Sequence, residues 1–374
     1  MTNVILIVKN KYIFMIIFKT KKILLGIVLA LGILILSGCG VSNQISKVPT
    51  FKLSQSIWKS ADGGASWELK NKGEGKANAE NVDVLSFTMN PFDSNNVFVG
   101  LRKGGILETV DGGETWKFID NYISVKVYGL ALSPADGKTL YASGVWQNKG
   151  KIFKTQNEGE TWTELYTSPT VGPIVISLVI DPKNTNIIYA TTDTNEAIKS
   201  ADGGETWKNI YLTDEPILKF VIDAEDSKLV YFLDNAGRIF RSFDGGEKFE
   251  DISKKVNDSI TSFGRGQFKV IRTDPNRAGH IYLAGADGIM RSVDKGETWE
   301  EIVALNNPED FPVRALAINP KNSDEMVYAM DQATYKSVDG GKTWKTFQFD
   351  NKMIANVLEY NSAKEGELYI GFTK

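Results

Sequence analysis

The sequence has very few metal-binding and redox-active side chains, with one cysteine and one histidine among 374 residues. A single cysteine cannot form a disulfide within the chain, so the fold is not stapled by disulfides. The lone histidine, His280, cannot supply a histidine-rich zinc site, and its place just before an apolar strand indicates a surface turn. We therefore expect no metal and no cofactor.

The sequence also lacks an excess of positive charge. It has 43 lysines and arginines against 46 aspartates and glutamates, a formal net charge of −3. The first 38 residues contain five lysines and no acidic residue, so the remainder carries 38 basic against 46 acidic residues, or −8. Nucleic-acid binding requires a basic face, and this balance argues against a nucleic-acid partner.

The N-terminal segment has the pattern of an export signal. Residues 19–22 are rich in lysine, residues 23–36 are an apolar run, and Leu36-Ser37-Gly38-Cys39 follows. A basic region, an apolar run and small residues at a cleavage site are typical of secretory signals. Leu-Ser-Gly-Cys resembles a bacterial lipobox. The resemblance implies that Cys39 is acylated and that the chain is cut just before it.

These features predict a lipoprotein signal peptide over residues 1–38 and a polar tether over 39–50. The mature protein would lie on the extracytoplasmic face of the cell membrane, held there by its lipid. An uncleaved transmembrane anchor is the alternative, although 14 apolar residues are short of the ~20 needed to span a bilayer. Translation from Met15 would give a signal of more usual length, and both start sites remain open.

Seven similar segments occur along the rest of the chain. A representative one is Ser200-Ala201-Asp202-Gly203-Gly204-Glu205-Thr206-Trp207, and its final aromatic residue recurs every 42 to 50 residues. This spacing matches one propeller blade of four short strands. The segments are residues 59–67, 108–116, 154–162, 199–207, 241–249, 291–299 and 336–344.

The segment chemistry predicts a structural turn. An aspartate accepts hydrogen bonds from backbone N–H groups of the turn that it starts, and the glycines permit positive φ. The aromatic ring packs on the blade, so each segment is expected to close the hairpin between third and fourth strands. Asn157 replaces the aspartate in one repeat and can still accept hydrogen bonds in the turn. Phe249 replaces the tryptophan in another repeat and can still pack its ring on the blade. The turn-forming residues are Asp62, Asp111, Asn157, Asp202, Asp244, Asp294 and Asp339.

Two apolar strands are expected before each repeat, except at the two ends of the chain. The last pair, 357–360 and 368–372, has no repeat after it, and the first repeat, near 57–69, has no pair before it. Together they complete one blade and leave no free sheet edge. The sequence therefore predicts an all-β, seven-bladed β-propeller over residues 51–374, with its last blade closed by N- and C-terminal strands.

The repeats are similar to those of the Asp-box (BNR) propeller superfamily. That group includes sialidases, xyloglucanase-type glycoside hydrolases, sortilin-like receptor domains and photosystem II assembly factors. The resemblance covers residues 51–374 and implies that the Asp boxes lie on the outer rim, on the face away from known active sites. The seven box residues are then scaffold, and the fold alone does not specify an activity.

The resemblance to enzymes of this group does not extend to their catalytic residues. The sequence has no Arg-Ile-Pro and no arginine before Arg102, which argues against a sialidase. Xyloglucanase-type enzymes use two carboxylates across a cleft between two propellers, and this chain has repeats for one propeller. We assign no catalytic residue and keep a glycoside hydrolase as the alternative function. The acidic residues expected on the face opposite the boxes, where they would cap turns, are Asp193, Glu196, Asp234, Asp287 and Asp331.

A binding module is the favoured interpretation. The longest connection between blades, 253–267, contains Phe263-Gly264-Arg265-Gly266, and other loops of that face offer Arg102, Trp146 and Arg238. Arginine and exposed aromatic residues are common in protein recognition. We expect a monomeric, membrane-anchored scaffold that binds a protein, peptide or glycan ligand, in the manner of an assembly or envelope factor.

Overall fold

The computed structural model describes residues 3–9, 12–18, 50–52, 55–75, 82–122, 126–260, 267–350 and 352–374. The chain divides into two units, Met1–Val48 and Pro49–Lys374. In the first unit, β1 (Asn3–Lys9) pairs with β2 (Tyr12–Phe18) in antiparallel orientation. The apolar run 23–36, Cys39 and the tether up to residue 49 lie outside the described residues.

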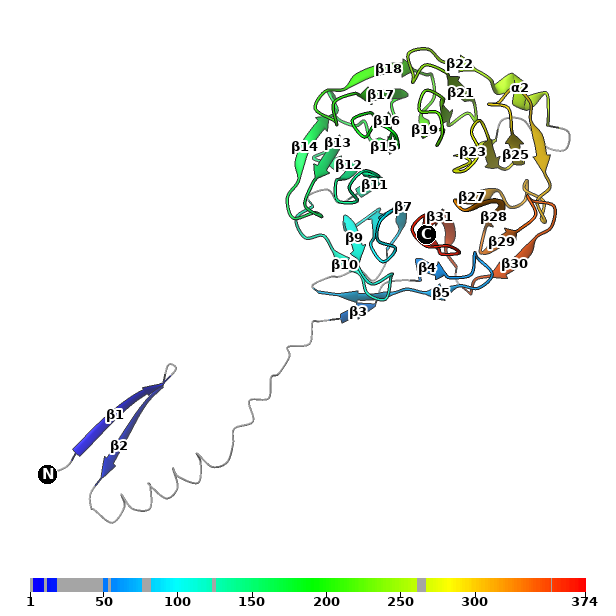
Figure 1. Ribbon diagram of the computed structural model, residues 1–374. Helices are drawn as coiled ribbons and strands as arrows, with labels where there is room; N and C mark the ends of the chain where they lie inside the picture. The colour runs from blue at the N-terminus through cyan, green and yellow to red at the C-terminus, as the bar shows by residue number, and fades with distance from the viewer. Residues whose placement is uncertain are drawn as a thin grey trace. The chain divides into compact units, whose positions relative to one another are not determined.

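The second unit is a ring of seven four-stranded antiparallel blades (Figure 1), which confirms the predicted propeller. Blades 1 to 3 consist of β7 (Val84–Met89), β8 (Val97–Leu101), β9 (Ile106–Thr109), β10 (Lys117–Phe118); β11 (Lys126–Leu132), β12 (Leu140–Trp146), β13 (Lys149–Thr155), β14 (Thr163–Thr167); and β15 (Val175–Ile180), β16 (Ile188–Thr192), β17 (Glu196–Ser200), β18 (Lys208–Leu212). Blades 4 to 6 consist of β19 (Ile217–Ile222), β20 (Val230–Asp234), β21 (Ile239–Ser242), β22 (Glu250–Asp251); β23 (Phe268–Thr273), β24 (Ile281–Gly285), β25 (Gly288–Ser292), β26 (Glu300–Ile302); and β27 (Val313–Asn319), β28 (Asn322–Met330), β29 (Ala333–Ser337), β30 (Lys345–Gln348).

Blade 7 is built from both ends of the propeller. Its strand order is β31 (Ile354–Tyr360), β32 (Leu368–Thr373), β4 (Ile57–Ser60) and β5 (Glu68–Leu69). The register places Leu368 opposite Ser60 and Gly371 opposite Ile57. The predicted closure by N- and C-terminal strands is therefore confirmed, and it leaves the first and last blades hydrogen-bonded through one shared sheet.

In the described part of the second unit, a two-stranded sheet and a short helix lie outside the seven blades. Strand β3 (Thr50–Lys52) pairs with β6 (Lys72–Glu74), so Thr50, which the sequence placed in the tether, belongs to a strand. Helix α2 (Ser253–Asn257) begins the long connection between blades 4 and 5. In the described part of the chain, no helix combines the length and apolar character needed to cross a bilayer.

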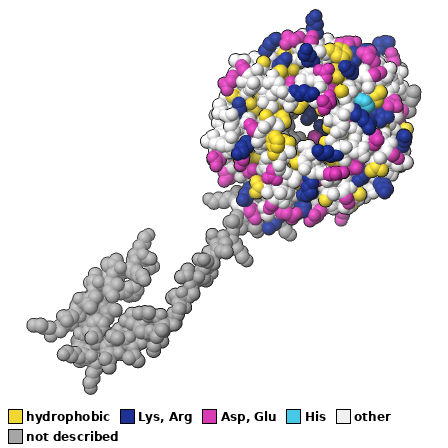
Figure 2. All heavy atoms as spheres, in the orientation of Figure 1, with side chains coloured by type: hydrophobic (Ala, Val, Ile, Leu, Met, Phe, Trp, Pro, Cys, Tyr) yellow, Lys and Arg dark blue, Asp and Glu magenta, His cyan; other side chains and the backbone are white. Residues whose placement is uncertain are grey.

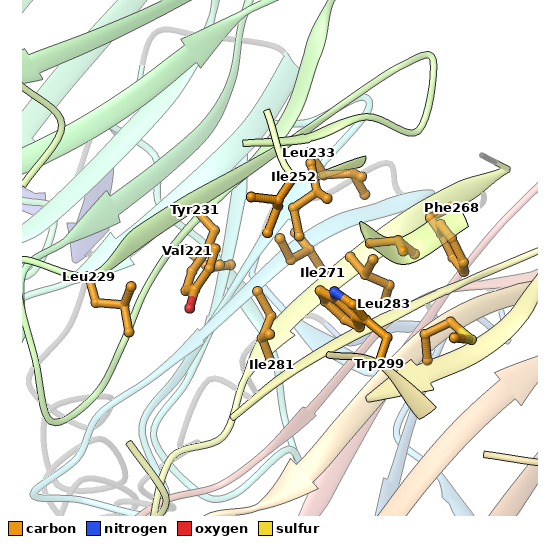
Figure 3. Close-up of a cluster of buried hydrophobic side chains, with 13 residues drawn as sticks. Val221, Leu229, Tyr231, Leu233, Ile252, Phe268, Ile271, Ile281, Leu283 and Trp299 are labelled. Atoms are coloured by element: carbon orange, nitrogen blue, oxygen red, sulfur yellow. The ribbon is translucent and has the colours of Figure 1, made fainter. Parts of the chain in front are cut away.

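The hydrophobic core lies between neighbouring blades. The second strands β8, β16, β20 and β24 are buried along their whole length, because each is covered by a neighbouring blade on both faces. One core cluster joins Val221, Tyr231 and Leu233 of blade 4 to Ile271 and Leu283 of blade 5 (Figure 3). Comparable clusters join the other pairs of neighbouring blades, so the ring is held by a repeated interface.

Each Asp box is a closed hydrogen-bond network. In the fourth repeat, Ser200 Oγ donates to Asp202 Oδ1 at 2.8 Å and accepts the amide of Gly204 at 2.8 Å. Asp202 Oδ1 accepts the amide of Thr206 at 2.9 Å, and Oδ2 accepts the Thr206 hydroxyl at 2.5 Å. Gly203 has φ +73° and Gly204 has φ +97°, the left-handed conformation that the predicted turn requires.

The two divergent boxes keep this geometry. In the third repeat, Asn157 Oδ1 accepts the amide of Thr161 at 3.0 Å, and Glu158 takes the positive φ, 57°, of the replaced glycine. In the fifth repeat, which ends in phenylalanine, Asp244 Oδ1 accepts the amide of Lys248 at 3.0 Å. The turn therefore tolerates a change at either end of the motif, as the sequence predicted.

The aromatic rings that end the boxes are packed to different depths. Trp116 is fully buried, whereas Trp207 is half-buried. The Trp207 indole donates from Nε1 to the Gly204 carbonyl at 2.9 Å, within its own box. The contribution of these rings to the core therefore differs from blade to blade.

A second network, which we call the clasp, connects each of several boxes to the preceding blade. A tyrosine hydroxyl of the second strand donates to the carbonyl of the residue after the box aspartate in the next blade. At ring closure, this bond joins the last and first blades. The bonds run from Tyr141 to Gly203 (3.0 Å), Tyr189 to Gly245 (2.9 Å), Tyr231 to Lys295 (3.1 Å) and Tyr369 to Gly112 (2.9 Å).

A basic side chain from the third strand reinforces the clasp. Lys199 Nζ donates to the same Gly245 carbonyl at 2.8 Å and lies over the Tyr189 ring, 5.5 Å from its centroid. Each carbonyl oxygen held in this way accepts two hydrogen bonds, one of them from a cation. The corresponding bonds to the next box come from Lys59 to Gly112 (2.8 Å) and Arg241 to Lys295 (2.7 Å).

The clasp is altered where the first blade meets the second. Phe98 and Glu108 occupy the positions of the tyrosine and the basic residue, and the box that they face is the divergent one with Asn157 and Glu158. Burial raises the pKa of Glu108, and the nearby Glu158 carboxylate raises it further. The box with Asn157 therefore faces a blade that lacks the clasp, whereas the box with Phe249 keeps it through Tyr189 and Lys199.

The box aspartates predict a loss of stability in acid. The hydroxyl and amide of Thr206 lower the pKa of Asp202 to about 2, below its value of ~3.9 in an unfolded chain. The unfolded state then binds more protons between these values, so the contribution is complete above pH ~4 and is lost as pH falls through ~2. In thermal melts between pH 5 and pH 2.5, Asp202→Asn should show a smaller fall in melting temperature than wild type. Asp350→Asn, an exposed residue outside the boxes, is the control, and equal falls in both variants would contradict the assignment.

The clasp predicts a non-additive effect at one carbonyl. Tyr189→Phe and Lys199→Met each remove one donor from the Gly245 oxygen and should each cost about 1 kcal/mol. The double variant removes both donors, so its cost in denaturant unfolding should exceed the sum of the single costs. Tyr166→Phe serves as the control, because its hydroxyl makes no hydrogen bond to the described residues. Strict additivity of the two substitutions would show that they do not share an acceptor.

Candidate functional site

The first strands of the seven blades surround the axis of the ring (Figure 1). They are β7, β11, β15, β19, β23, β27 and β31. We call the space that they enclose, which contains two cavities, the channel. The channel holds a cavity of about 210 Å³ to which all seven strands contribute residues. In Figure 2 the centre of the ring is open, and basic and acidic side chains are visible inside the opening.

Every first strand carries a β-bulge near its start. In β7 the register moves from Val84 opposite Leu101 to Ser86 opposite Gly100, which leaves Leu85 as the extra residue. A bulge re-aims a side chain out of the regular alternation of the strand. The seven extra residues all line the cavity, and we call them the mouth residues: Leu85, Tyr128, Ile176, Leu218, Lys269, Arg314 and Asn356.

The mouth residues lie at the end of the channel away from the Asp boxes. Each of several boxes is bonded to the turn between the first and second strands of its own blade, as in the bond of 2.9 Å from the Gly203 amide to the Asn186 carbonyl. That turn is at the far end of the first strand from the bulge. The bulges therefore open on the face opposite the boxes, where the sequence placed a recognition surface.

The mouth has an apolar half and a polar half. Blades 1 to 4 contribute Leu85, Tyr128, Ile176 and Leu218, all partly exposed to the channel. Blades 5 to 7 contribute Lys269, Arg314 and Asn356, all exposed. The arrangement places two cations beside a continuous apolar arc on the same rim.

The three polar mouth residues differ in the hydrogen bonds that they make with the rest of the protein. Lys269 Nζ donates to the side chain of Asn235 at 3.2 Å and also to its backbone carbonyl. Asn356 Nδ2 donates to the Val84 carbonyl at 2.9 Å and so links blades 7 and 1. Arg314 makes no hydrogen bond or ion pair with the described residues. Its guanidinium is therefore available to a ligand.

Deeper in the channel lies a second group of charges. Lys219, Arg272 and Glu359 line both the mouth cavity and a further cavity of about 320 Å³ towards the box face. Arg272 donates to Glu359 Oε1 at 2.6 Å and to the Leu316 carbonyl at 2.9 Å. We call this level the waist of the channel.

The structure places the predicted binding residues apart from the mouth. Arg102 is exposed beside blade 1 and pairs with Asp83 at 3.3 Å. Arg238 of blade 4 pairs with Asp234 at 2.6 Å and also with Asp214. Trp146 is half-buried at the end of β12. These three come from different blades and none of them lines the channel, while Phe263 and Arg265 lie outside the described residues.

The acidic residues considered for catalysis act mainly within their loops. Asp193 Oδ1 accepts the Ile174 amide at 2.6 Å, and Asp287 Oδ2 accepts the Gln267 amide at 2.6 Å. Asp234 is buried and accepts the Arg238 amide at 2.8 Å. Glu196 accepts from Asn209 at 3.3 Å, and Asp331 takes a positive φ of 48° in its turn. Within the described residues, no cluster of His, Cys, Asp or Glu is arranged to hold a metal ion.

Sequence reasoning missed the mouth residues and the waist. They share no residue type, and a bulge is set by strand pairing, which the sequence does not display. An alignment of the seven first strands on their boxes would have brought the mouth positions into one column. The change from apolar residues in blades 1–4 to lysine, arginine and asparagine in blades 5–7 is the signal that such a column contains.

The family-model match covers part of the propeller. A model described as "Sortilin, neurotensin receptor 3" matches residues 150–274. The xyloglucanase Xgh74A of Acetivibrio thermocellus is 29% identical over 168 residues, which are 34% of this chain and 20% of that protein. An oligoxyloglucan-reducing end-specific xyloglucanase of Emericella nidulans is 28% identical over 101 residues, 25% of this chain and 12% of that protein. The chain thus spans a fifth or less of the length of these curated relatives.

Solved structures share the fold over a longer stretch. The GH74 xyloglucanase from Xanthomonas campestris has a TM-score of 0.65 at 15% identity, and the match covers 87% of this chain and 52% of that one. YCF48 bound to D1 peptide has a TM-score of 0.58 at 16% identity, and the match covers 78% of this chain and 93% of that one. Identities this low establish the shared architecture and leave the activity open.

The seven hydrogen-bonded boxes, the closed ring and these matches agree with the resemblance seen in the sequence. Together these findings support a β-propeller of the Asp-box (BNR) type.

Proposed function

We propose that the propeller is a binding module that holds a protein or peptide segment at the channel mouth. The face with the Asp boxes maintains the ring, and the opposite face recognises the ligand. We further propose that the protein is a lipoprotein anchored through Cys39 on the extracytoplasmic side of the cell membrane, where it serves as a monomeric assembly or envelope factor.

The observation that carries this proposal is the divided mouth. Arg314 offers a guanidinium that has no partner among the described residues, and the apolar arc of Leu85, Ile176 and Leu218 lies on the same rim. A guanidinium can bind a carboxylate through two parallel hydrogen bonds. A segment with acidic and apolar side chains would satisfy both halves of the mouth, whereas a uniformly charged polymer would satisfy only one.

The structural relatives offer a precedent for binding by a propeller of this size. YCF48 was solved bound to D1 peptide, and this chain covers 93% of that structure. The GH74 structures are about twice as long as the matched part, since the chain covers 51% and 52% of two of them. The size difference therefore gives less support to a hydrolase activity than to peptide binding for a single propeller.

The chemistry of the channel also favours binding over the alternative, a glycoside hydrolase. The two-carboxylate mechanism needs a pair of acidic side chains across the bound sugar. Among the described residues that line the two cavities, Glu359 is the one carboxylate, and it is bonded to Arg272. A hydrolase would have to recruit its second carboxylate from outside this lining.

A photo-crosslinking amino acid tests the site in living cells. Placed at Leu218, at the mouth, it should form covalent adducts with a protein partner, because the proposed ligand covers that side chain. Placed at Val338, which is exposed on the box face, it should give none. Arg314→Glu should reduce the Leu218 adduct strongly by repelling the acidic segment, while Lys345→Glu on the outer strand β30 should leave it unchanged. Adducts from Val338 with none from Leu218 would contradict the proposed face.

The anchor is tested separately by labelling with a fatty-acid analogue. Cys39→Ser should abolish incorporation and release the propeller from membranes, because no other thiol exists in the chain. A mutant that stays unlabelled but remains membrane-bound at full length would instead indicate the uncleaved transmembrane anchor. Continued labelling of the mutant would refute acylation at this residue.

A further inference from the structure

One cation at the waist of the channel has no partner among the described residues. Lys219 of β19 makes no hydrogen bond or ion pair with them, although its side chain is only partly exposed. An ammonium group that is shielded from solvent loses hydration energy, and a counter-charge or hydrogen bonds from the protein normally offset this loss. The basic neighbour of this ammonium is Arg272, whose positive charge disfavours the protonated form of Lys219.

The acidic residue of the waist is already engaged. Glu359 of β31 accepts from Arg272 at 2.6 Å, and the same guanidinium donates to the backbone carbonyls of Leu316 and Leu358 at 2.9 and 3.4 Å. Two cations and one carboxylate leave the waist with a net positive charge. Lys269 and Arg314 at the mouth add further positive charge along the path into the channel.

Apolar and polar groups both line the waist. The cavity between the waist and the box face is lined by the apolar side chains of Leu178, Phe220, Val221, Ala317 and Ile318 together with the hydroxyl-bearing Thr273, Tyr360 and Ser362. Cavities of about 210 and 320 Å³ meet at Lys219, so there is room for more than a single ion. Pockets that combine an apolar lining with a few convergent polar groups are typical of sites for organic ligands.

We propose that the waist is a binding site for an organic carboxylate, whose charged group bonds to Lys219 beside Arg272 while its hydrocarbon part contacts the apolar wall. One monovalent carboxylate neutralises the net charge of the waist, which a divalent oxyanion would reverse. The site does not depend on the protein ligand proposed for the mouth. Its carboxylate has two possible sources, a small free acid or the end of a peptide chain that enters from the mouth.

The proposed site has a defined dependence on pH. Burial, with a smaller effect from Arg272, lowers the pKa of Lys219 to about 8, and Glu359 acts in the opposite direction. Affinity for a carboxylate should therefore fall as pH rises through about 8, as Lys219 loses its charge. Burial raises the pKa of the Tyr360 phenol, so that group stays protonated over this range. The other titratable groups that line the two cavities are Tyr128, Lys269 and Arg314.

Calorimetric titration of the purified protein with butyrate, at constant ionic strength set with chloride, tests the site. Wild type should bind butyrate more tightly at pH ~6.5 than at pH ~9.5, because the Lys219 ammonium is charged only at the lower value. Lys219→Gln should weaken binding by about tenfold or more, the loss of one charged hydrogen bond. Lys219→Arg should retain binding and lose its pH dependence, and Lys269→Gln at the mouth should bind as wild type does. Melting curves would verify that the variants are folded.

Two further ligands distinguish the sources. A hydrophobic peptide with a free C-terminal carboxylate that binds more tightly than butyrate, while its C-terminal amide does not bind, would assign the site to a chain end. Butyrate binding at least as tight as that of the peptide would assign it to a free acid. If neither butyrate nor the peptide gives a heat of binding that depends on Lys219 at either pH, the waist site is overturned. The mouth proposal would remain intact.

Discussion

The structure depends on the packing of each blade against its neighbours, and at four interfaces of the described ring the clasp also bonds a box carbonyl to the preceding blade. A propeller blade buries its second strand only if a neighbour covers each face, so no blade is stable by itself. The clasp fixes where that neighbour sits. In the pair formed by Tyr189 and Lys199, a hydroxyl and an ammonium both donate to the Gly245 oxygen, at 2.9 and 2.8 Å. The Asp box holds that oxygen in place by closing the turn around it.

The clasp also occupies polar groups of the box face. The polar groups of the boxes bond to each other, and box carbonyls are taken by the preceding blade. At the closure of the ring, Tyr369 and Lys59 complete the same contact to Gly112. On the opposite face the first strands begin with bulges, and the bulged residues take no part in the clasp. The bulged residues are free to vary, and the change from an apolar to a polar half of the mouth occurs among them.

The sequence was sufficient to predict the seven blades, their spacing and the closure of the last one. Those features follow from local chemistry, since aspartate, glycine and tryptophan at fixed offsets specify a turn wherever they occur. The clasp was not predicted, although Lys59, Lys199 and Arg241 stand at the first position of their boxes. Their acceptor belongs to another blade, 46 to 54 residues away, and only the assembled ring brings the two together.

The residues that the sequence nominated for binding differ from those of the site that we propose. Arg102, Trp146 and Arg238 were selected because arginine and tryptophan in loops are common in binding surfaces, but Arg102 and Arg238 are held by Asp83 and Asp234. Loop position does not reveal such partners. The mouth and the waist consist of strand residues whose exposure results from a register shift and from the width of the channel, and both are properties of the closed ring.

The central claim is that ligands meet this protein at the channel and that the box face serves as scaffold. Lysine acetylation footprinting of the protein in its native membranes, compared with the purified protein, tests this claim most directly. Lys269 at the mouth and Lys342 in the sixth-blade box are both exposed, so each reports on its own face. The account predicts that Lys269 reacts more slowly in membranes than after purification, while Lys342 reacts equally in both. Protection of Lys342 with no protection of Lys269 would contradict it.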